Sequence, residues 1–133
     1  MKRTNEVSKL VGVSRRTLQY YDDEGMLAVE RSQTNHRLYD QQALERIWRI
    51  LIYKEMRVEL REIKQILSMS DDAQREYFRM RIHENEEKIR KLQGQNAFIA
   101  RISAEGMPQK PEENEGVTYT ERIQELRKNQ RRK

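Results

Sequence analysis

Near its N-terminus the chain carries a pattern that two short helices crossing through a tight turn require. Ser8 is small enough for a second helix to approach closely, and Gly12 can end the first helix in the left-handed conformation. Ser14 then supplies a cap for the second helix, while Thr4 or Asn5 can cap the first. Helix pairs of this kind commonly dock in the major groove of DNA, so we expect a helix-turn-helix here.

Helical spacing gives the second helix of this pair two different faces. At about 100° per residue, Leu18 and Tyr21 point to one side. The other side carries guanidinium, amide and phenol groups, from Arg15, Arg16, Gln19 and Tyr20. The two arginines fall in the first helical turn, where the helix dipole disfavours a cation by roughly 0.3–1 kcal/mol. A polyanion would compensate, and the pattern favours DNA binding over two solvated surface arginines.

The composition favours long solvated helices and an anionic partner. Charged residues make up 37% of the 133 residues, and the formal net charge is +5. The absence of cysteine excludes disulfides, zinc fingers and thiol sensors, and the two histidines, His36 and His83, form no metal-ligand cluster. No apolar run approaches the roughly 20 residues of a membrane span, and the basic start lacks a signal peptide's apolar stretch. We expect a cytoplasmic bacterial protein without a cofactor.

The residues after the helix pair predict a short hairpin, or wing. One strand is expected over residues 27–29, and the chain would return as a second strand through Arg37, Leu38 and Tyr39. Strand alternation then turns Leu38 inward and leaves Arg37 and Tyr39 facing outward. Asp22, at the end of the preceding helix, either orients Arg37 through a salt bridge or is a solvated acid.

Two more amphipathic helices are expected to complete a small core. Asp40 can cap the first of them, which reaches about residue 56. Its single tryptophan, Trp48, is expected to anchor the core rather than to stack on a ligand. Apolar residues at helical spacing mark the second helix over residues 60–67, and Ser70 is a possible cap for the helix that follows.

A long helix with a coiled-coil seam is predicted from residue 71 to about residue 102. Its stripe is spaced alternately four and three residues apart and consists of Phe78, Ile82, Asn85, Ile89, Leu92, Asn96 and Ile99. Nothing else in the chain is long enough to cover this stripe, so we predict a homodimer; the alternative is packing back onto the chain's own domain. The two seam asparagines would lower stability and specify register.

The remaining residues predict a linker and a basic tail. Two prolines and three glutamates fill residues 106–116, and Thr120 can cap a last helix. Five of the final seven residues, 127–133, are basic. We expect this tail to be disordered, with docking onto the dimer or additional DNA contacts as the alternatives.

Several of these segments, in this order, resemble the MerR family of bacterial transcription regulators. The likeness covers residues 4–68 and is carried by EVSKLVGVS at 6–14, TLQYYD at 17–22, GML at 25–27, HRLY at 36–39 and LREIKQIL at 60–67. It implies a mainly α protein with three parts: a winged helix-turn-helix DNA-binding domain at 1–69, a dimerising helix in an antiparallel coiled coil at 70–104, and a linker with a basic tail helix at 105–133.

The resemblance also implies a function and a set of contacts. Members of the family bind pseudo-palindromic promoters as homodimers and distort the spacer DNA so that RNA polymerase engages both promoter elements. The residues expected at double-stranded DNA are Arg3, Ser14, Arg15, Arg16, Thr17, Gln19, Tyr20, Tyr21, Arg37 and Tyr39. Tyr21 would mainly pack.

The sequence departs from the family pattern at a few positions. Gln19 replaces a common arginine, which affects base preference, and Asn35 stands where the wing usually has glycine. Arg57 likewise replaces a usual glycine between two helices. Only about 30 residues follow the long helix, too few for an independent ligand-enclosing domain. No effector is assigned, although one between the tail helix and the dimer would meet Tyr119, Ile123 and Leu126.

The sequence is also compatible with other functions. An excisionase-like or architectural DNA-binding factor would use the same surface, and genomic binding sites would separate it from a promoter regulator. A coiled-coil interaction scaffold is a different class, and salt-dependent binding to duplex DNA would exclude it. The sequence does not favour an enzyme, since it has no glycine-rich phosphate loop, thiol nucleophile or recognisable histidine–carboxylate motif.

Overall fold

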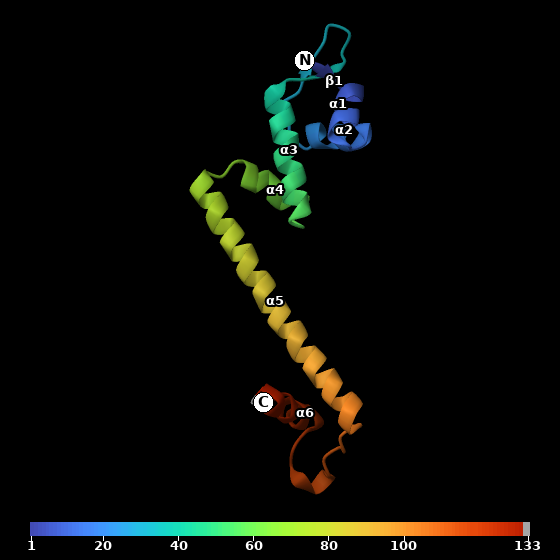
Figure 1. Ribbon diagram of the computed structural model, residues 1–133, viewed down its shortest axis with the longest axis vertical. Helices are drawn as coiled ribbons and strands as arrows, with labels where there is room; N and C mark the ends of the chain where they lie inside the picture. Colours follow the sequence, from blue (N-terminus) through green and yellow to red (C-terminus); the bar gives the residue numbers. More distant parts are fainter. Residues whose placement is uncertain (132–133) are drawn as a thin grey trace. The chain divides into compact units, whose positions relative to one another are not determined.

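A computed structural model describes residues 1–131 of the chain. Within them lie six α-helices, three short strands and one 3-10 turn (Figure 1). The chain divides into two compact units, Met1–Gln74 and Arg75–Lys133. The mainly α fold class is confirmed.

The expected helix-turn-helix is present in the first unit. Helices α1 (Thr4–Val11) and α2 (Arg15–Asp23) meet at Gly12, whose φ of +79° is the left-handed conformation that glycine adopts without strain. Neither Thr4 nor Asn5 caps α1. The N-cap residue is Arg3, whose backbone N–H donates to Glu6 Oε1 at 3.3 Å, so the first helix starts one residue earlier than capping chemistry alone suggested.

The wing is a three-stranded antiparallel sheet in the order β1-β3-β2. Its strands are β1 (Lys2–Arg3), β2 (Glu30–Arg31) and β3 (Arg37–Tyr39). The strand expected at residues 27–29 is wrong, because Leu27 is buried in the core and pairing begins only at Glu30. A two-residue N-terminal strand has no periodicity to read, which is why the sequence did not reveal β1.

The wing's inward and outward faces are the reverse of those expected. Tyr39 is only 1% exposed, whereas Leu38 is half-buried. Because β3 is the central strand, one of its faces is covered by the helix-turn-helix, and Tyr39 lies on that face with its hydroxyl 3.5 Å from Thr4 Oγ1. The aromatic ring therefore belongs to the core.

Helix α3 (Gln41–Glu55) begins where expected, because Asp40 Oδ1 accepts from the Ala43 backbone N–H at 2.8 Å. Its buried residues are Ala43, Ile47, Ile50 and Tyr53. Trp48 is not a core anchor, since it is 62% exposed. The helix carries a second apolar stripe, and Trp48 belongs to that stripe together with the half-buried Leu44 and Leu51.

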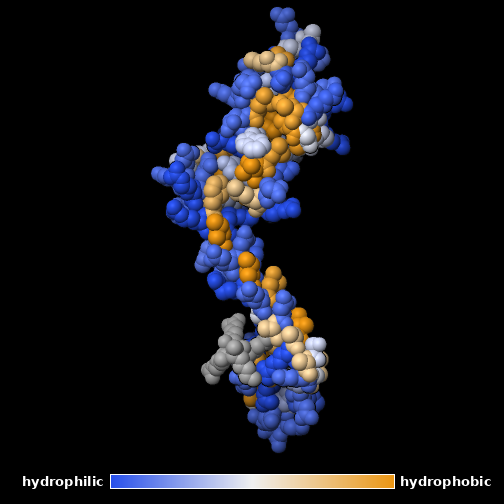
Figure 2. Space-filling model, in the orientation of Figure 1, coloured by the Kyte–Doolittle hydropathy of each residue, from blue (hydrophilic) through white to orange (hydrophobic). Residues whose placement is uncertain are grey.

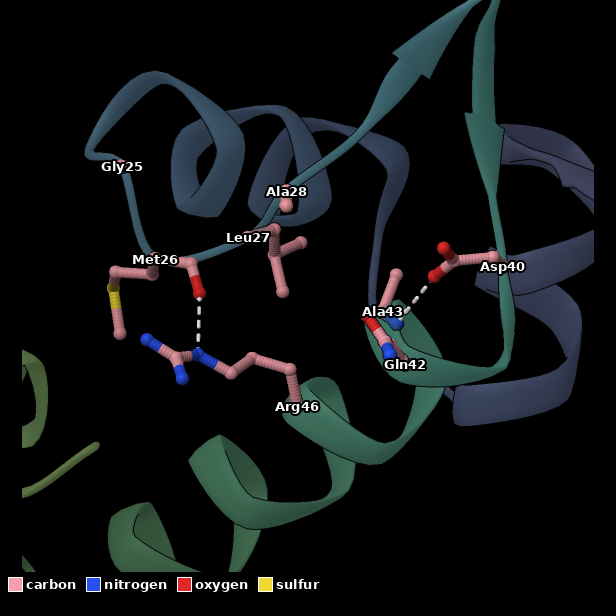
Figure 3. Close-up of a pocket in the computed structure, with 8 residues that line it drawn as sticks. All are labelled: Gly25, Met26, Leu27, Ala28, Asp40, Gln42, Ala43 and Arg46. Atoms are coloured by element: carbon pink, nitrogen blue, oxygen red, sulfur yellow. Dashed lines mark hydrogen bonds between the residues drawn. The ribbon is translucent and has the colours of Figure 1, made fainter. Parts of the chain in front are cut away.

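A side chain of α3 holds the segment that leaves α2. Arg46 reaches up to this segment, and its Nε donates to the Met26 carbonyl at 3.0 Å (Figure 3). Gly25, with a φ of +73°, supplies the left-handed turn that brings Met26 back over α3. A cavity of about 330 Å³ opens beside this bond, and two of its lining side chains, Asp40 and Arg46, already serve the α3 cap and the bond to Met26.

The first unit closes with α4 (Leu60–Leu67) and the start of α5 (Asp71–Glu105). Ser70 caps α5 as expected, since its Oγ accepts from the Ala73 N–H at 3.2 Å. Gln74, on the first turn of α5, is buried: it accepts from the Tyr53 hydroxyl at 2.9 Å and donates to the Ile66 carbonyl at 3.2 Å. This buried amide fastens the beginning of α5 to α3 and α4.

In the second unit the tail returns as a helix, η1 (Glu113–Glu115) leading into α6 (Tyr119–Arg131). Its cap is Thr118 rather than Thr120, because Thr118 Oγ1 accepts from the Glu121 N–H at 3.1 Å. The expectation of a disordered tail is wrong for the part that the structure describes; residues 132–133 of the basic tail lie outside it.

Side chains link the middle of α6 to the C-terminal half of α5, beside which α6 lies (Figure 1). The Arg127 guanidinium lies 5.2 Å from the Phe98 ring centroid and donates to the Gly94 carbonyl at 3.4 Å. Arg101 reaches in the other direction and donates to the Leu126 carbonyl at 3.3 Å. Each helix thus contributes an arginine that holds the other.

Candidate nucleic-acid interface

Local hydrogen bonds fix the orientation of α2. Ser14 Oγ accepts from the Thr17 N–H at 3.1 Å, and Ser8 Oγ donates to the Val13 carbonyl at 2.6 Å, which closes the turn between α1 and α2. Leu18 and Tyr21 are buried beneath the helix. The small residue, the turn and the cap act together as the sequence predicted.

The opposite face of α2 is exposed and cationic. Arg15, Arg16, Gln19 and Tyr20 are all exposed there, as expected. Among residues 1–131, no carboxylate is found at ion-pair distance from Arg15 or Arg16, although both stand at the positive end of the helix dipole. Two cations held in this position without an internal counter-charge favour an external polyanion.

Arg37 ties the wing to α2. Its Nε lies 2.9 Å from Asp22 Oδ2, and a second guanidinium nitrogen lies 3.5 Å from Asp23 Oδ1. The two acids stand at the negative end of α2, where a carboxylate is disfavoured, so Arg37 neutralises an unfavourable local charge while it positions the wing. Of the two roles left open for Asp22, the salt bridge is confirmed.

A groove runs between the start of α2 and the wing. Its lining contains four arginines and no carboxylate: Arg3, Thr4, Asn5, Arg15, Gln19, Arg31, Asn35, His36 and Arg37. Arginine suits phosphate because its planar group donates two parallel hydrogen bonds. The groove therefore joins the predicted residues Arg3, Arg15, Gln19 and Arg37 into one surface.

Arg31 is a groove residue that the sequence reasoning missed. It pairs directly with Arg37 across the β2–β3 ladder, and its Nη1 donates to the Asn35 carbonyl at the wing turn, 3.2 Å away. Like charges placed opposite each other destabilise a sheet. With the correct strand register, this Arg–Arg pair would have been the signal.

Two predicted contact residues lie in the core instead of on this surface. Tyr21 and Tyr39 are each only 1% exposed. Tyr21 was expected mainly to pack, and Lys54 Nζ lies 3.4 Å from its hydroxyl. For Tyr39 the expected outward orientation is wrong, and its ring supports the wing from beneath.

The predicted seam forms a second exposed surface, on α5. Figure 2 shows apolar areas in a broken row along this helix, between charged side chains. Ile82, Ile89, Leu92 and Ile99 are all more than half exposed, and Phe78 is half-buried. On a neighbouring face, Arg90 donates to Glu87 and holds the pKa of that carboxyl below its usual range.

Other kinds of site find no support in the described chain. Residues 1–131 contain no group of three or more histidine, cysteine, aspartate or glutamate side chains placed to hold a metal ion. Over the same residues, none of the helices combines the length and apolar content that crossing a bilayer requires.

Comparison with known proteins identifies the family to which this fold belongs. Residues 2–70, just over half of the chain, match the family described as MerR HTH family regulatory protein. The chain belongs to the MerR family. The resemblance read from the sequence motifs is therefore confirmed, and so is the assignment of the helix-turn-helix and wing to a MerR-type DNA-binding fold.

Relatives of the MerR chain are named as transcription regulators. The HTH-type transcriptional regulator CueR of Bacillus subtilis is 42% identical over 62 residues, which cover 47% of this chain and 43% of the relative. The HTH-type transcriptional activator TipA of Streptomyces coelicolor is 35% identical over 95 residues, 71% of this chain and 38% of the relative. The chain thus spans less than half the length of these relatives.

Solved structures show the same fold. The N-terminal part of MtaN, the Bacillus subtilis multidrug transporter activator, has a TM-score of 0.69 at 27% identity, over 76% of this chain and 96% of that one. HiNmlR, described as a MerR family regulator lacking the sensor domain and bound to promoter DNA, has a TM-score of 0.54 at 22% identity. That comparison covers 83% of this chain and 98% of HiNmlR.

Proposed function

We propose that this MerR-family chain is a sequence-specific transcription regulator that binds a pseudo-palindromic promoter as a homodimer. The observation that carries the proposal is the four-arginine groove beside the exposed face of α2. The names of its relatives support the regulatory role, and HiNmlR, with the same fold, was seen on promoter DNA.

The residues divide the recognition between them. Arg15, Arg16, Gln19 and Tyr20 face the base edges of the major groove, with Ser14 and Thr17 at the entry of α2. Arg3, Arg31 and Arg37 contact the flanking phosphates, which position the protein without reading sequence. Tyr21 and Tyr39 act indirectly, because they hold α2 and the wing in place.

Each of the three parts of the chain is assigned one role. Residues 1–69 bind DNA, residues 70–104 pair two chains through an antiparallel coiled coil, and residues 105–133 form a linker and tail. The paired molecule would act in the cytoplasm, distort the DNA between two promoter elements, and so change how RNA polymerase engages them.

The DNA-binding proposal is tested in two steps. Duplexes that bind the protein are first selected from a random pool, and the affinity for the selected site is then measured at several salt concentrations. Affinity is expected to fall steeply with salt, since each phosphate contact releases counterions. Arg31→Ala is expected to weaken selected and random duplexes alike and to reduce the slope of log K against log salt by about 1.

The matched control is Lys110→Ala, which removes one unit charge from the exposed linker and is expected to leave the slope unchanged. A chain that binds no duplex even at low ionic strength would overturn the proposal. An Arg31→Ala protein whose salt slope is unaltered would show that the groove does not contact phosphates.

A further inference from the structure

The central part of the α5 seam reads the same from both ends. Six residues, Ile82, Asn85, Ile89, Leu92, Asn96 and Ile99, follow one another at spacings of three, four, three, four and three. Their side chains run isoleucine, asparagine, aliphatic, aliphatic, asparagine, isoleucine. Spacing and chemistry therefore share one centre, between residues 90 and 91.

This palindromic block is open in the single chain. Ile82, Ile89, Leu92 and Ile99 are 58%, 52%, 57% and 62% exposed, and both asparagines are exposed as well. Helix α6 does not compete for the block. Its contacts on α5 are at Gly94, Phe98 and Arg101, each two residues after a seam position and thus about 200° around the helix.

Only one antiparallel alignment of two such helices matches every layer. The spacings between seam residues, counted from Ile82 toward the C-terminus, equal those counted from Ile99 of the partner subunit toward its N-terminus. This alignment places Asn85 opposite the partner's Asn96, and Ile89 opposite the partner's Leu92. If the partner helix is shifted by one seam position, a three-residue spacing on one helix faces a four-residue spacing on the other. The seam side chains of the two helices then no longer lie at the same level.

We propose that two symmetry-related Asn85–Asn96 pairs set the register in which a second copy of the chain covers this surface. The inference rests on the homodimer of the proposed function and specifies its alignment. An amide has both donors and an acceptor, so two facing asparagines satisfy each other, while an asparagine facing leucine is left unpaired. The pairs lower affinity relative to an all-aliphatic seam and exclude shifted alignments.

A double-mutant cycle on the full chain tests the alignment, with the dimer dissociation constant measured by sedimentation equilibrium. Asn85→Leu alone leaves two asparagines per dimer facing leucine and is expected to weaken the dimer at least tenfold. Asn96→Leu alone is expected to do the same. The double variant replaces both members of each pair and is expected to bind at least a hundredfold more tightly than either single variant.

The cycle separates this alignment from a parallel one. Within one helix the two positions are eleven residues, roughly 16 Å, apart, too far for direct coupling. In a parallel dimer each asparagine would face its own copy, so each single variant would tighten the dimer and the two effects would be independent. Independent, tightening effects would overturn the proposal. Asn114→Leu, at an exposed position outside α5, is the control and is expected to change nothing.

Cross-linking gives a second reading, because the natural chain has no cysteine. An Ile82→Cys protein mixed with an Ile99→Cys protein is expected to form the mixed disulfide in preference to either self-disulfide. Preferential self-disulfides would contradict the alignment while leaving a homodimer in place. A wild-type chain that stays monomeric at tens of micromolar would instead contradict the homodimer of the proposed function. The DNA-binding part of that function is tested separately, by duplex binding.

Discussion

The two units of this MerR-family chain bury their apolar residues very differently. Among the residues whose exposure the structure describes, every buried aliphatic or aromatic side chain except that of Pro111 lies in the first unit, between Val7 and Leu67. In the second unit, only Pro111 is buried among the residues whose exposure the structure describes, and the isoleucines of α5 are largely open. The first unit has a core within one chain, whereas the second has an apolar stripe that the single chain leaves exposed.

The two units are therefore expected to be stabilised in different ways. Burying a large aliphatic side chain contributes about 1.5–3 kcal/mol, so the first unit is stabilised by its own core. The second unit is stabilised by the packing of α6 and, on the proposed function, by a partner chain. Its stability then depends on protein concentration, while that of the first unit does not.

The largest expected effect is on pairing. Ile89→Asp would place a carboxylate in the centre of the apolar seam of each chain, without a counter-charge, and is expected to weaken the dimer about a thousandfold. Light scattering against concentration measures this.

Met80→Asp is the matched control for Ile89→Asp. Met80 is on the same helix and is similarly exposed in the single chain, 47% against 52%, but it lies outside the seam. A Met80→Asp protein that dissociates as readily as Ile89→Asp would show that net charge, not the seam, governs pairing.

The next effect concerns the core of the first unit. Ile47 is fully buried, so Ile47→Ala is expected to lower the free energy of unfolding of this unit by about 2–5 kcal/mol at any protein concentration. Denaturant unfolding followed by far-ultraviolet circular dichroism measures this loss, because Trp48, the single tryptophan, is largely exposed in the folded unit and is a weak fluorescent probe. Ile89→Ala is the comparison, and in dilute monomer it is expected to leave the same transition unchanged.

A smaller effect is expected at the reading surface. Arg16→Ala removes an exposed guanidinium from α2 without disturbing the core, so specific affinity for a selected site is expected to fall by about 1–3 kcal/mol. Fluorescence anisotropy with the selected duplex measures it, and sedimentation is expected to show an unchanged dimer. An unaltered affinity and base preference would exclude Arg16 from recognition.

The smallest effect is a gain in stability. Arg57, between α3 and α4, has a φ of +63°, a left-handed conformation that strains a residue with a side chain. Arg57→Gly is expected to stabilise the first unit by about 0.5–1 kcal/mol, measured by thermal unfolding. This is the relief of backbone strain minus the larger conformational entropy that glycine has in the unfolded chain.

Asn35, at a φ of +65°, is the comparison. Asn35→Gly is expected to stabilise the unit less, because asparagine tolerates the left-handed region. A destabilised Arg57→Gly protein would show that contacts of Arg57 outweigh the strain.

Local chemistry predicted most of the first unit. Gly12, Ser14, Asp40 and Ser70 each act at a helix end through their own backbone or side chain, and the structure shows each of them in that role. The exposed face of α2 follows from helical geometry once the helix is known. These features depend on neighbours within a few residues, which a single sequence displays.

Features that depend on distant partners were harder to predict. Trp48 was misplaced because α3 carries two apolar stripes, and the sequence does not tell which of them meets the chain's own core. Tyr39 was turned outward because the pairing of β1 with β3 was not visible. Arg31 was missed because the register of β2 against β3 was not known. The contact of Arg127 with Phe98 joins two helices that are far apart in the sequence, and no local pattern predicts it.

On the proposed function, two chains, each with its own DNA-binding unit, act together on one duplex. The number of chains bound to the selected duplex decides this, and sedimentation measures it at a protein concentration too low for free chains to pair. Two chains per duplex are expected, and Ile89→Asp is expected to bind far more weakly. One chain per duplex at full specific affinity would contradict the proposed function.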